Sequence, residues 1–193
     1  TKILKGLNGI VEIPGDKSIS HRSIIIPSIT NGISEVKNIL KSKDVLRTIN
    51  AFKLMGVKIK EKNNCLLIYG KGLHSLSKPK NKINLGNSGT SARLLIGLLS
   101  AQNFDSFLFG DHSLSNRPMD RIINPLKKMG ADIDTNKNKL PIIVRGKKLK
   151  GIRYELNIPS AQVKSGISLA ALFLKDKTEI IEKDITRNHT EIM

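Results

Sequence analysis

The feature that most constrains the fold of this chain is an internal repeat. Residues 52–59 read FKLMGVKI and residues 126–133 read LKKMGADI, so lysine, methionine, glycine and isoleucine recur in one order. In each copy a helical pattern ends at the glycine, a residue typical of helix C-termini. A short strand follows and then, after an asparagine-rich turn, a second apolar strand at 65–70 or 140–146. The chain is therefore predicted to repeat one supersecondary unit.

The other part of the unit is a helix that begins among small hydroxyl residues. Residues 18–30 and 88–100 both become apolar after their first turn, and a third such helix starts at Ser160. Pro27 conflicts with the first helix, because proline inside a helix removes a hydrogen bond and kinks it. Packed by their strands, such units predict an α/β domain with helices inside or between sheets. We place the units at about 14–75, 83–149 and 151–193, with the third incomplete.

The chain carries a large surplus of positive charge. Its 193 residues include 33 Lys+Arg and 16 Asp+Glu, which gives a formal net charge of +17. Such a surplus favours anionic partners: nucleic acid, anionic lipid, or phosphorylated and carboxylated small molecules. The lysines are scattered and form no dense basic block, so a compositional bias of the genome is an alternative explanation for most of the surplus.

The cysteine content and the hydropathy pattern narrow the class of protein. Cys65 is the only cysteine, which excludes an internal disulfide and a multi-cysteine metal site and fits a reducing compartment. The first residues lack the apolar core of a signal peptide, and no apolar run approaches transmembrane length. We therefore expect a cytoplasmic protein that does not associate with membranes.

The starts of the three predicted helices are rich in residues that bind anions. They read DKSISHR at 16–22, GNSGTSAR at 86–93 and PSAQVKS at 159–165. Free backbone N–H groups and the helix dipole favour phosphate and carboxylate at such positions, and repeated units bring the three starts to one face. Arg117, in the loop 110–120, offers a bidentate fork for the same groups. These segments predict a site for a multiply anionic small molecule.

Each of these residues has a structural alternative when it is taken alone. The serines at 18, 88 and 160 are also typical helix N-caps. Arg22 and Arg93 are also typical partners in structural ion pairs. Gly89 is also explained as a turn glycine, Lys17 as a solvated surface lysine and His21 as a structural histidine.

Six segments together resemble the EPSP synthase family, the 3-phosphoshikimate 1-carboxyvinyltransferases. They are PGDKSISHR, SKDV at 42–45, LGNSGTSAR, NRPM at 116–119, PSAQVKS and TRNHTE at 186–191. The resemblance runs through the whole chain in the order of the family's N-terminal half. It implies an enolpyruvyl transferase-like fold, an inside-out α/β barrel of two domains that are each built from three βαβαββ units. Residues 14–193 would form one such domain, and residues 1–13 would supply the first strand or strands of the second.

The resemblance also implies a reaction. The enolpyruvyl group of phosphoenolpyruvate would pass to the 5-hydroxyl of shikimate-3-phosphate by addition and elimination, releasing phosphate in the shikimate pathway of aromatic amino acid biosynthesis. It implies no metal and no organic cofactor, glyphosate as an inhibitor, and a monomer at full length. Because the family's acidic catalytic residues lie in the half that this chain lacks, we expect the 193 residues alone to be inactive.

Individual roles follow where this sequence matches the family motifs. Lys17 matches the lysine that contacts both substrates and takes part in proton transfer. The residues that match shikimate-3-phosphate ligands are Lys17, Ser18, Arg22, Ser160, Ala161, Gln162 and Arg187. The residues that match phosphoenolpyruvate contacts are Lys17, Gly89, Arg117 and Gln162. Asp44 and Asn87 match residues that support these ligands, and Gly89 stands where glyphosate-tolerant members can carry alanine.

Two other functions are alternatives to this one. UDP-N-acetylglucosamine enolpyruvyltransferase shares the fold and phosphoenolpyruvate, but it typically has Lys-Asn at Lys17-Ser18 and a loop cysteine near His112. A nucleic-acid-binding module would explain the net charge of +17, but aromatic residues make up only 4% of the chain and no stacking motif is present. We therefore expect small-molecule substrates and no nucleic acid partner.

Overall fold

The computed structural model describes residue 6 and residues 9–63 and 65–193. The first half contains α1 (Lys17–Ser28), β1 (Asn31–Val36), α2 (Lys43–Leu54), β2 (Lys58–Lys62), β3 (Cys65–Lys71), β4 (Ile83–Asn84) and α3 (Gly89–Ser100). The second half contains β5 (Asp105–Phe109), α4 (His112–Ser115), α5 (Asp120–Lys128), β6 (Asp132–Asn136), β7 (Lys139–Arg145), β8 (Arg153–Leu156), α6 (Ala161–Ala171), β9 (Glu179–Glu182) and α7 (His189–Ile192).

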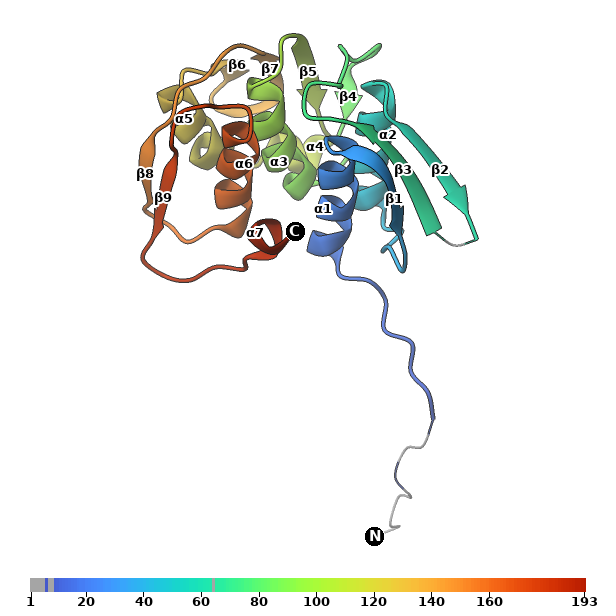
Figure 1. Cartoon of the computed structure of the whole chain (residues 1–193). Helices are drawn as coiled ribbons and strands as arrows, with labels where there is room; N and C mark the ends of the chain where they lie inside the picture. The colour runs from blue at the N-terminus through green and yellow to red at the C-terminus, as the bar shows by residue number, and fades with distance from the viewer. Residues whose placement is uncertain (1–5, 7–8, 64) are drawn as a thin grey trace.

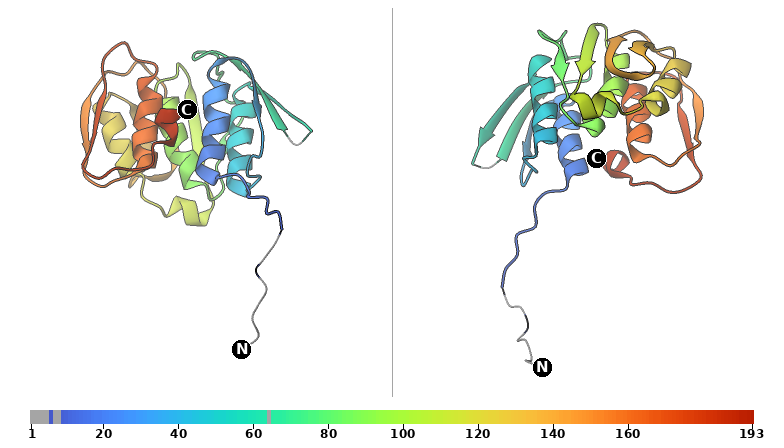
Figure 2. Two further views of the ribbon diagram at one scale, coloured as in Figure 1. Left: turned by 60° about the horizontal axis from the view of Figure 1, so that its bottom comes forward. Right: turned by 180° about the vertical axis from the view of Figure 1, so that it is seen from behind.

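Three small sheets lie around a group of central helices (Figures 1 and 2). Their strand orders are β1-β3-β2, β4-β5-β7-β6 and β8-β9. In the second sheet β4 pairs parallel with β5, whereas β7 pairs antiparallel with both β5 and β6. The first sheet repeats the antiparallel part of this pattern and the third sheet repeats its parallel part. The three sheets therefore contain parts of one βαβαββ arrangement, with helices inside and strands outside.

The predicted strand within residues 1–13 falls largely on residues 1–5 and 7–8, which lie outside the described residues. Residues 9–16 contain neither helix nor strand. In Figures 1 and 2 this segment runs away from the body of the molecule before α1 begins.

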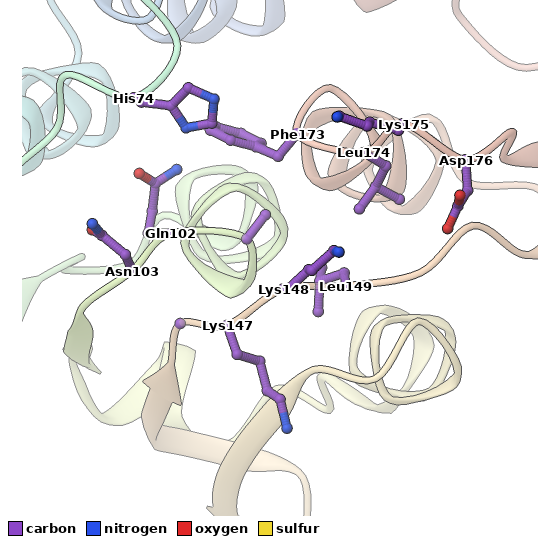
Figure 3. Close-up of a pocket in the computed structure, with 12 residues that line it drawn as sticks. His74, Gln102, Asn103, Lys147, Lys148, Leu149, Phe173, Leu174, Lys175 and Asp176 are labelled. Carbon is purple, nitrogen blue, oxygen red and sulfur yellow. The ribbon is translucent and has the colours of Figure 1, made fainter.

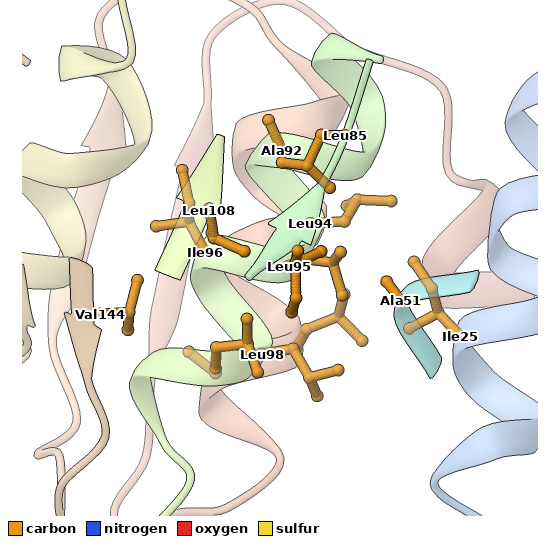
Figure 4. Close-up of a cluster of buried hydrophobic side chains, with 14 of the residues drawn as sticks. Ile25, Ala51, Leu85, Ala92, Leu94, Leu95, Ile96, Leu98, Leu108 and Val144 are labelled. Carbon is orange, nitrogen blue, oxygen red and sulfur yellow. The ribbon is translucent and has the colours of Figure 1, made fainter. Parts of the chain in front are cut away.

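The core is centred on α3, which is apolar on nearly every side. Leucine and isoleucine side chains of this helix are fully buried against α1, α2 and the second sheet (Figure 4). Where α3 meets α6, a Cβ atom placed on Gly97 would lie 2.0 Å from the carbonyl oxygen of Gly166. The two helix backbones are therefore in direct contact at this crossing, which only glycine permits.

The repeat seen in the sequence ends its helices in the expected way. Gly56 after α2 and Gly130 after α5 have φ values of 90° and 95°, the left-handed conformation of a C′ glycine. Each is followed by a two-stranded hairpin, β2–β3 or β6–β7. The helix ends predicted from the two similar octapeptides are confirmed.

The first helix differs from its predicted form in two respects. Asp16, and not Ser18, is its N-cap, because the Asp16 carboxylate accepts a hydrogen bond of 2.8 Å from the Ile19 N–H. Pro27 lies in the last turn of α1, which ends at Ser28 and not at the predicted residue 30. Proline is disfavoured in the interior of a helix, and here only one helical residue follows it. Ser88 and Ser160 are the N-caps of α3 and α6, as their positions predicted.

No helix within the described residues is both long enough and apolar enough to cross a membrane.

Candidate active site

Three central helices begin at matching positions, α1 at Lys17, α3 at Gly89 and α6 at Ala161. A cleft of about 370 Å³ opens at the starts of α1 and α6 and beside α3. The residues that line this cleft are Ser18, Arg22, Arg93, Arg121, Ser160, Ala161, Gln162, Arg187 and His189. It therefore gathers six of the seven residues matched to shikimate-3-phosphate ligands, all except Lys17.

Arg22 is a buried cation in this cleft with only 3% of its surface exposed. Its guanidinium donates to the Ser18 carbonyl at 2.9 Å, the Ser165 hydroxyl at 2.7 Å and the Thr190 hydroxyl at 2.5 Å. Burial lowers the pKa of Arg22, and the charges of Glu191 and Asp16 oppose that shift from a distance. Among the described residues no carboxylate forms an ion pair with it, so the structural ion-pair alternative is wrong for Arg22. A buried guanidinium held only by neutral acceptors is suited to an anionic ligand.

Arg93 also lines the cleft, and it connects two of the helix starts. It donates to the Gln162 side-chain oxygen at 3.1 Å and to the Gly89 carbonyl at 3.3 Å. The Gln162 amide in turn donates to the Thr90 hydroxyl at 3.1 Å. Burial lowers the pKa of Arg93, and the nearby charges of Arg117 and Arg121 lower it further. Arg93 therefore joins the starts of α3 and α6 and holds Gln162 in a fixed orientation.

The start of α3 lies under two guanidinium groups. A Cβ atom placed on Gly89 would lie 2.9 Å from Arg93 Nη1 and 3.2 Å from Arg117 Nη1. Arg117 donates to the Asn87 side-chain oxygen at 2.5 Å, which brings the predicted supporting residue next to the predicted ligand. Gly89 is the first residue of α3, so the alternative interpretation of Gly89 as a turn glycine is wrong. Its missing side chain lets both arginines approach the helix start closely.

Lys17 lies beside the cleft and does not line it. Its side chain forms an ion pair with Asp44 of α2, and 49% of the lysine side chain is exposed. The Asp44 side chain is more buried, with 21% exposed, and it lines a second cavity with Asn87 and Arg47. Asp44, one of the two residues matched to a supporting role, therefore contacts Lys17 directly.

The C-terminal residues 186–192 cover one side of the cleft. Arg187 and His189 line it directly, and Thr190 of α7 contacts Arg22. Lys164, whose side chain is only 9% exposed, bonds Glu182 at 2.5 Å and Glu191 at 2.7 Å and so fixes α7 against α6. Arg93, Arg121 and His189 also line the cleft, although no family motif gives them a role. The second arginine of the segment NRPMDR was a usable signal for Arg121.

A larger cavity of about 650 Å³ lies near the other ends of α3 and α6 (Figure 3). Ala101, Gln102, Phe173 and Leu174 line it together with exposed lysines. Helix C-termini carry partial negative charge, which disfavours an anion there and favours it at the N-termini. The smaller cleft is therefore the stronger candidate for anion binding. Among the described residues no group of three or more His, Cys, Asp or Glu side chains gathers to hold a metal ion.

Comparisons with known proteins agree on one family. The family model described as EPSP synthase (3-phosphoshikimate 1-carboxyvinyltransferase) matches residues 1–193. A 3-phosphoshikimate 1-carboxyvinyltransferase of Vesicomyosocius okutanii is 54% identical over 186 residues, which cover 96% of this chain and 43% of that protein. One of Ruthia magnifica is 52% identical over 193 residues, which cover 100% of this chain and 44% of that protein.

A solved structure of EPSP synthase from Acinetobacter baumannii is 50% identical and superposes with a TM-score of 0.92. The match covers 95% of this chain and 42% of that chain. This similarity confirms the predicted α/β, enolpyruvyl transferase-like fold. The chain spans less than half the length of the curated relatives that it matches.

Proposed function

Because this chain belongs to the EPSP synthase family, we propose that the full-length enzyme carrying it makes 5-enolpyruvylshikimate-3-phosphate. The 5-hydroxyl oxygen of shikimate-3-phosphate forms a bond to C2 of phosphoenolpyruvate and gives up its proton, while the methylene carbon gains one. Elimination then breaks the bond from C2 to the phosphate oxygen, releases phosphate and removes a proton from the new methyl group. The reaction needs cations that hold two phosphorylated carboxylates side by side.

The observation that carries this proposal is the cleft around Arg22. A buried guanidinium without a carboxylate partner among the described residues faces the start of α6, where backbone N–H groups are free. We assign the phosphate of shikimate-3-phosphate to the Ser160 hydroxyl, the Ala161 N–H and the exposed Arg187. Ser18 and Arg22 hold the same substrate from α1. Helix starts and arginine forks both favour such anions.

The phosphoenolpyruvate subsite is assigned to the start of α3. Gly89 lets Arg93 and Arg117 lie close to the helix start, and Gln162, which accepts a hydrogen bond from Arg93, also lines the cleft. Lys17 is assigned to proton transfer, with Asp44 holding its ammonium group toward the helix starts. Asn87 orients Arg117 through the hydrogen bond of 2.5 Å. These roles agree with the charge of the two substrates.

Further properties of the enzyme belong to the same proposal. The relatives are more than twice as long as this chain, so we propose that residues outside it complete the site and that these 193 residues alone do not catalyse the reaction. We also propose inhibition by glyphosate, a monomeric enzyme and a cytoplasmic location, with which the single free Cys65 is compatible.

The test is titration calorimetry of the full-length enzyme with shikimate-3-phosphate, with unphosphorylated shikimate as the control ligand. Arg22→Ala should weaken binding by at least about 30-fold, because removing one partner of a buried charged contact costs about 2–5 kcal/mol. Arg145→Ala is the matched control, since Arg145 pairs with Asp132 and Asp134 on the β6–β7 hairpin. Binding that ignores the phosphate, or that survives Arg22→Ala unchanged, contradicts the proposed site.

A further inference from the structure

A chain of buried hydrogen bonds connects three helices behind the proposed site. His21 Nδ1 of α1 lies 2.8 Å from the Thr48 hydroxyl of α2, which lies 2.7 Å from the Ser91 hydroxyl of α3. The Ser91 hydroxyl lies 2.6 Å from that of Ser88, the N-cap of α3. All four residues have 0% of their surface exposed.

One assignment of donors and acceptors satisfies all three hydroxyl groups of this hydrogen-bonded series. Burial, above all, lowers the pKa of His21 to about 4, so its ring is neutral near pH 7. With Nδ1 as acceptor, Thr48 donates to His21, Ser91 donates to Thr48, and Ser88 donates to Ser91. The Ser88 oxygen also accepts the Ser91 N–H at 3.2 Å, so every hydroxyl is satisfied. Of the side-chain N and O atoms of His21, Thr48, Ser91 and Ser88, His21 Nε2 alone has no partner among the described residues.

Other buried serines of the same helices do not behave in this way. The Ser28 hydroxyl of α1 donates to the Ile24 carbonyl at 2.6 Å, and the Ser100 hydroxyl of α3 donates to the Ile96 carbonyl at 2.7 Å. Both bonds stay within one helix, at its C-terminal end. A buried polar connection between helices fixes their relative position more narrowly than apolar packing does, because misplacement leaves polar groups unpaired.

Each of the three helices joined by these hydrogen bonds carries a residue of the proposed site next to a hydrogen-bonded residue. His21 lies one turn after Lys17 on α1, Thr48 lies one turn after Asp44 on α2, and Ser88 directly precedes Gly89. The connection therefore ties the Lys17–Asp44 ion pair to the start of α3, where Gly89 lies under Arg117.

We propose that His21, Thr48 and Ser91 are positioning residues that set the distance between Lys17 and the phosphoenolpyruvate subsite. This inference rests on the proposed function. The three side chains touch no substrate and act through the start of α3. Loss of these hydrogen bonds moves the start of α3 relative to α1, whereas the contacts of Arg22 and α6 with shikimate-3-phosphate stay in place.

The test compares two substitutions at Thr48 in the full-length enzyme. Thr48→Val keeps the shape and removes the hydroxyl, while Thr48→Ser keeps the hydroxyl and removes a methyl group. We expect Thr48→Val to raise the KM for phosphoenolpyruvate about tenfold, since small misplacements of reacting groups are costly. The KM for shikimate-3-phosphate should change by less than about twofold, and Thr48→Ser should resemble the wild type.

Further variants separate positioning from stability. Ser91→Ala should repeat the effect of Thr48→Val, whereas Ser100→Ala, which removes an equally buried hydroxyl of α3, should leave both KM values unchanged. His21→Asn retains an acceptor near the Nδ1 position and should rescue the KM that His21→Leu impairs.

Three outcomes overturn the inference. An unchanged KM for phosphoenolpyruvate in a folded Thr48→Val enzyme overturns it, and so does an equal defect in Thr48→Ser. A wild-type enzyme that does not release phosphate from the two substrates overturns the proposed function and this inference with it.

Discussion

Arg22 and Thr190, which lie 168 residues apart in the sequence, are joined by a hydrogen bond of 2.5 Å from Nε to Oγ1. The bond links the first helix to the last described one. The Thr190 hydroxyl then donates to Ser165 at 2.6 Å, and Ser165 also accepts from Arg22 Nη2. With the bond to Ser18, three of the five guanidinium N–H groups are fixed by the protein. The other two have no hydrogen-bond partner among the described residues.

The Arg22→Lys substitution should therefore weaken the binding of shikimate-3-phosphate, although it keeps the positive charge. An ammonium group cannot satisfy three separated acceptors and also present a planar fork to the substrate. We expect the affinity of the full-length enzyme for shikimate-3-phosphate to fall about 10- to 100-fold, the range of a lost charged hydrogen bond. Thr190→Val, which removes only one orienting bond, should cost less. Calorimetry that finds Arg22→Lys equal to the wild type would show that charge alone matters.

Gly89→Ala should impair phosphoenolpyruvate binding without unfolding the protein. The added methyl group would meet the mobile ends of Arg93 and Arg117, which must move away from the start of α3. Alanine at the first position of a helix is otherwise favourable, so the free energy of unfolding should change by less than about 1 kcal/mol. Steady-state kinetics should show about a tenfold higher KM for phosphoenolpyruvate.

The residue at position 89 should also determine how strongly glyphosate inhibits the enzyme. With glycine at 89, the wild-type enzyme lacks the methyl group that would crowd the inhibitor, so we expect glyphosate to inhibit it. The Gly89→Ala enzyme should need more glyphosate for the same inhibition. Unchanged turnover of the wild-type enzyme at high glyphosate would contradict this prediction.

Much of the fold could be predicted from local signals in the sequence. The glycines at 56 and 130 end helices because their backbone conformation is left-handed, a requirement that is visible in each octapeptide. The serines at 88 and 160 cap helices for similarly local reasons. The alternative interpretation of Ser18 as the cap of α1 is wrong, because Asp16 is the cap. Aspartate and serine are both good caps, and local preference alone does not choose between them.

The site was less accessible to this reasoning because it depends on contacts between distant segments. The anion-binding character of the helix starts follows from local chemistry, and six of the seven predicted shikimate-3-phosphate residues line one cleft. The arginine at 121 joins the cleft only through the packing of α5, and His189 joins it only through α7. The link from His21 to Ser91 crosses three helices, so no sequence spacing announces it.

Gly97→Ala should strongly destabilise the protein. The new methyl group would lie 2.0 Å from the Gly166 carbonyl oxygen, a backbone atom that moves only if α3 and α6 separate. Overpacking of this kind typically costs 1–3 kcal/mol, and we expect at least about 3 kcal/mol in denaturant unfolding because no side chain can rotate away. Gly9→Ala is the control, since a Cβ atom at Gly9 would meet nothing within 4 Å. Equal stability of the two variants would contradict the close helix crossing.

His21 should make the stability of the protein depend on pH above the range of the carboxylates. Its pKa is about 4 in the folded state, lowered from 6.5 mainly by burial and further by the charges of Lys17 and Arg22, while Asp44 opposes the shift. The unfolded chain therefore binds more protons between these two values, and stability rises with pH through that window. The free energy of unfolding should fall by about 2 kcal/mol between pH 7 and pH 5 from this group alone.

Urea unfolding of the wild type and of His21→Asn at pH 5, 6 and 7 measures this contribution. Asp16 and Glu182, whose pKa values are lowered from 3.8 and 4.5, stabilise the fold above those values and lose that effect only at lower pH. They do not account for a change between pH 7 and pH 5. Asparagine does not titrate, so His21→Asn lacks this pH dependence. The free energy of unfolding of the wild type, relative to that of His21→Asn, should therefore be about 2 kcal/mol lower at pH 5 than at pH 7. Parallel pH profiles would show that His21 is hydrated and protonates in the folded state.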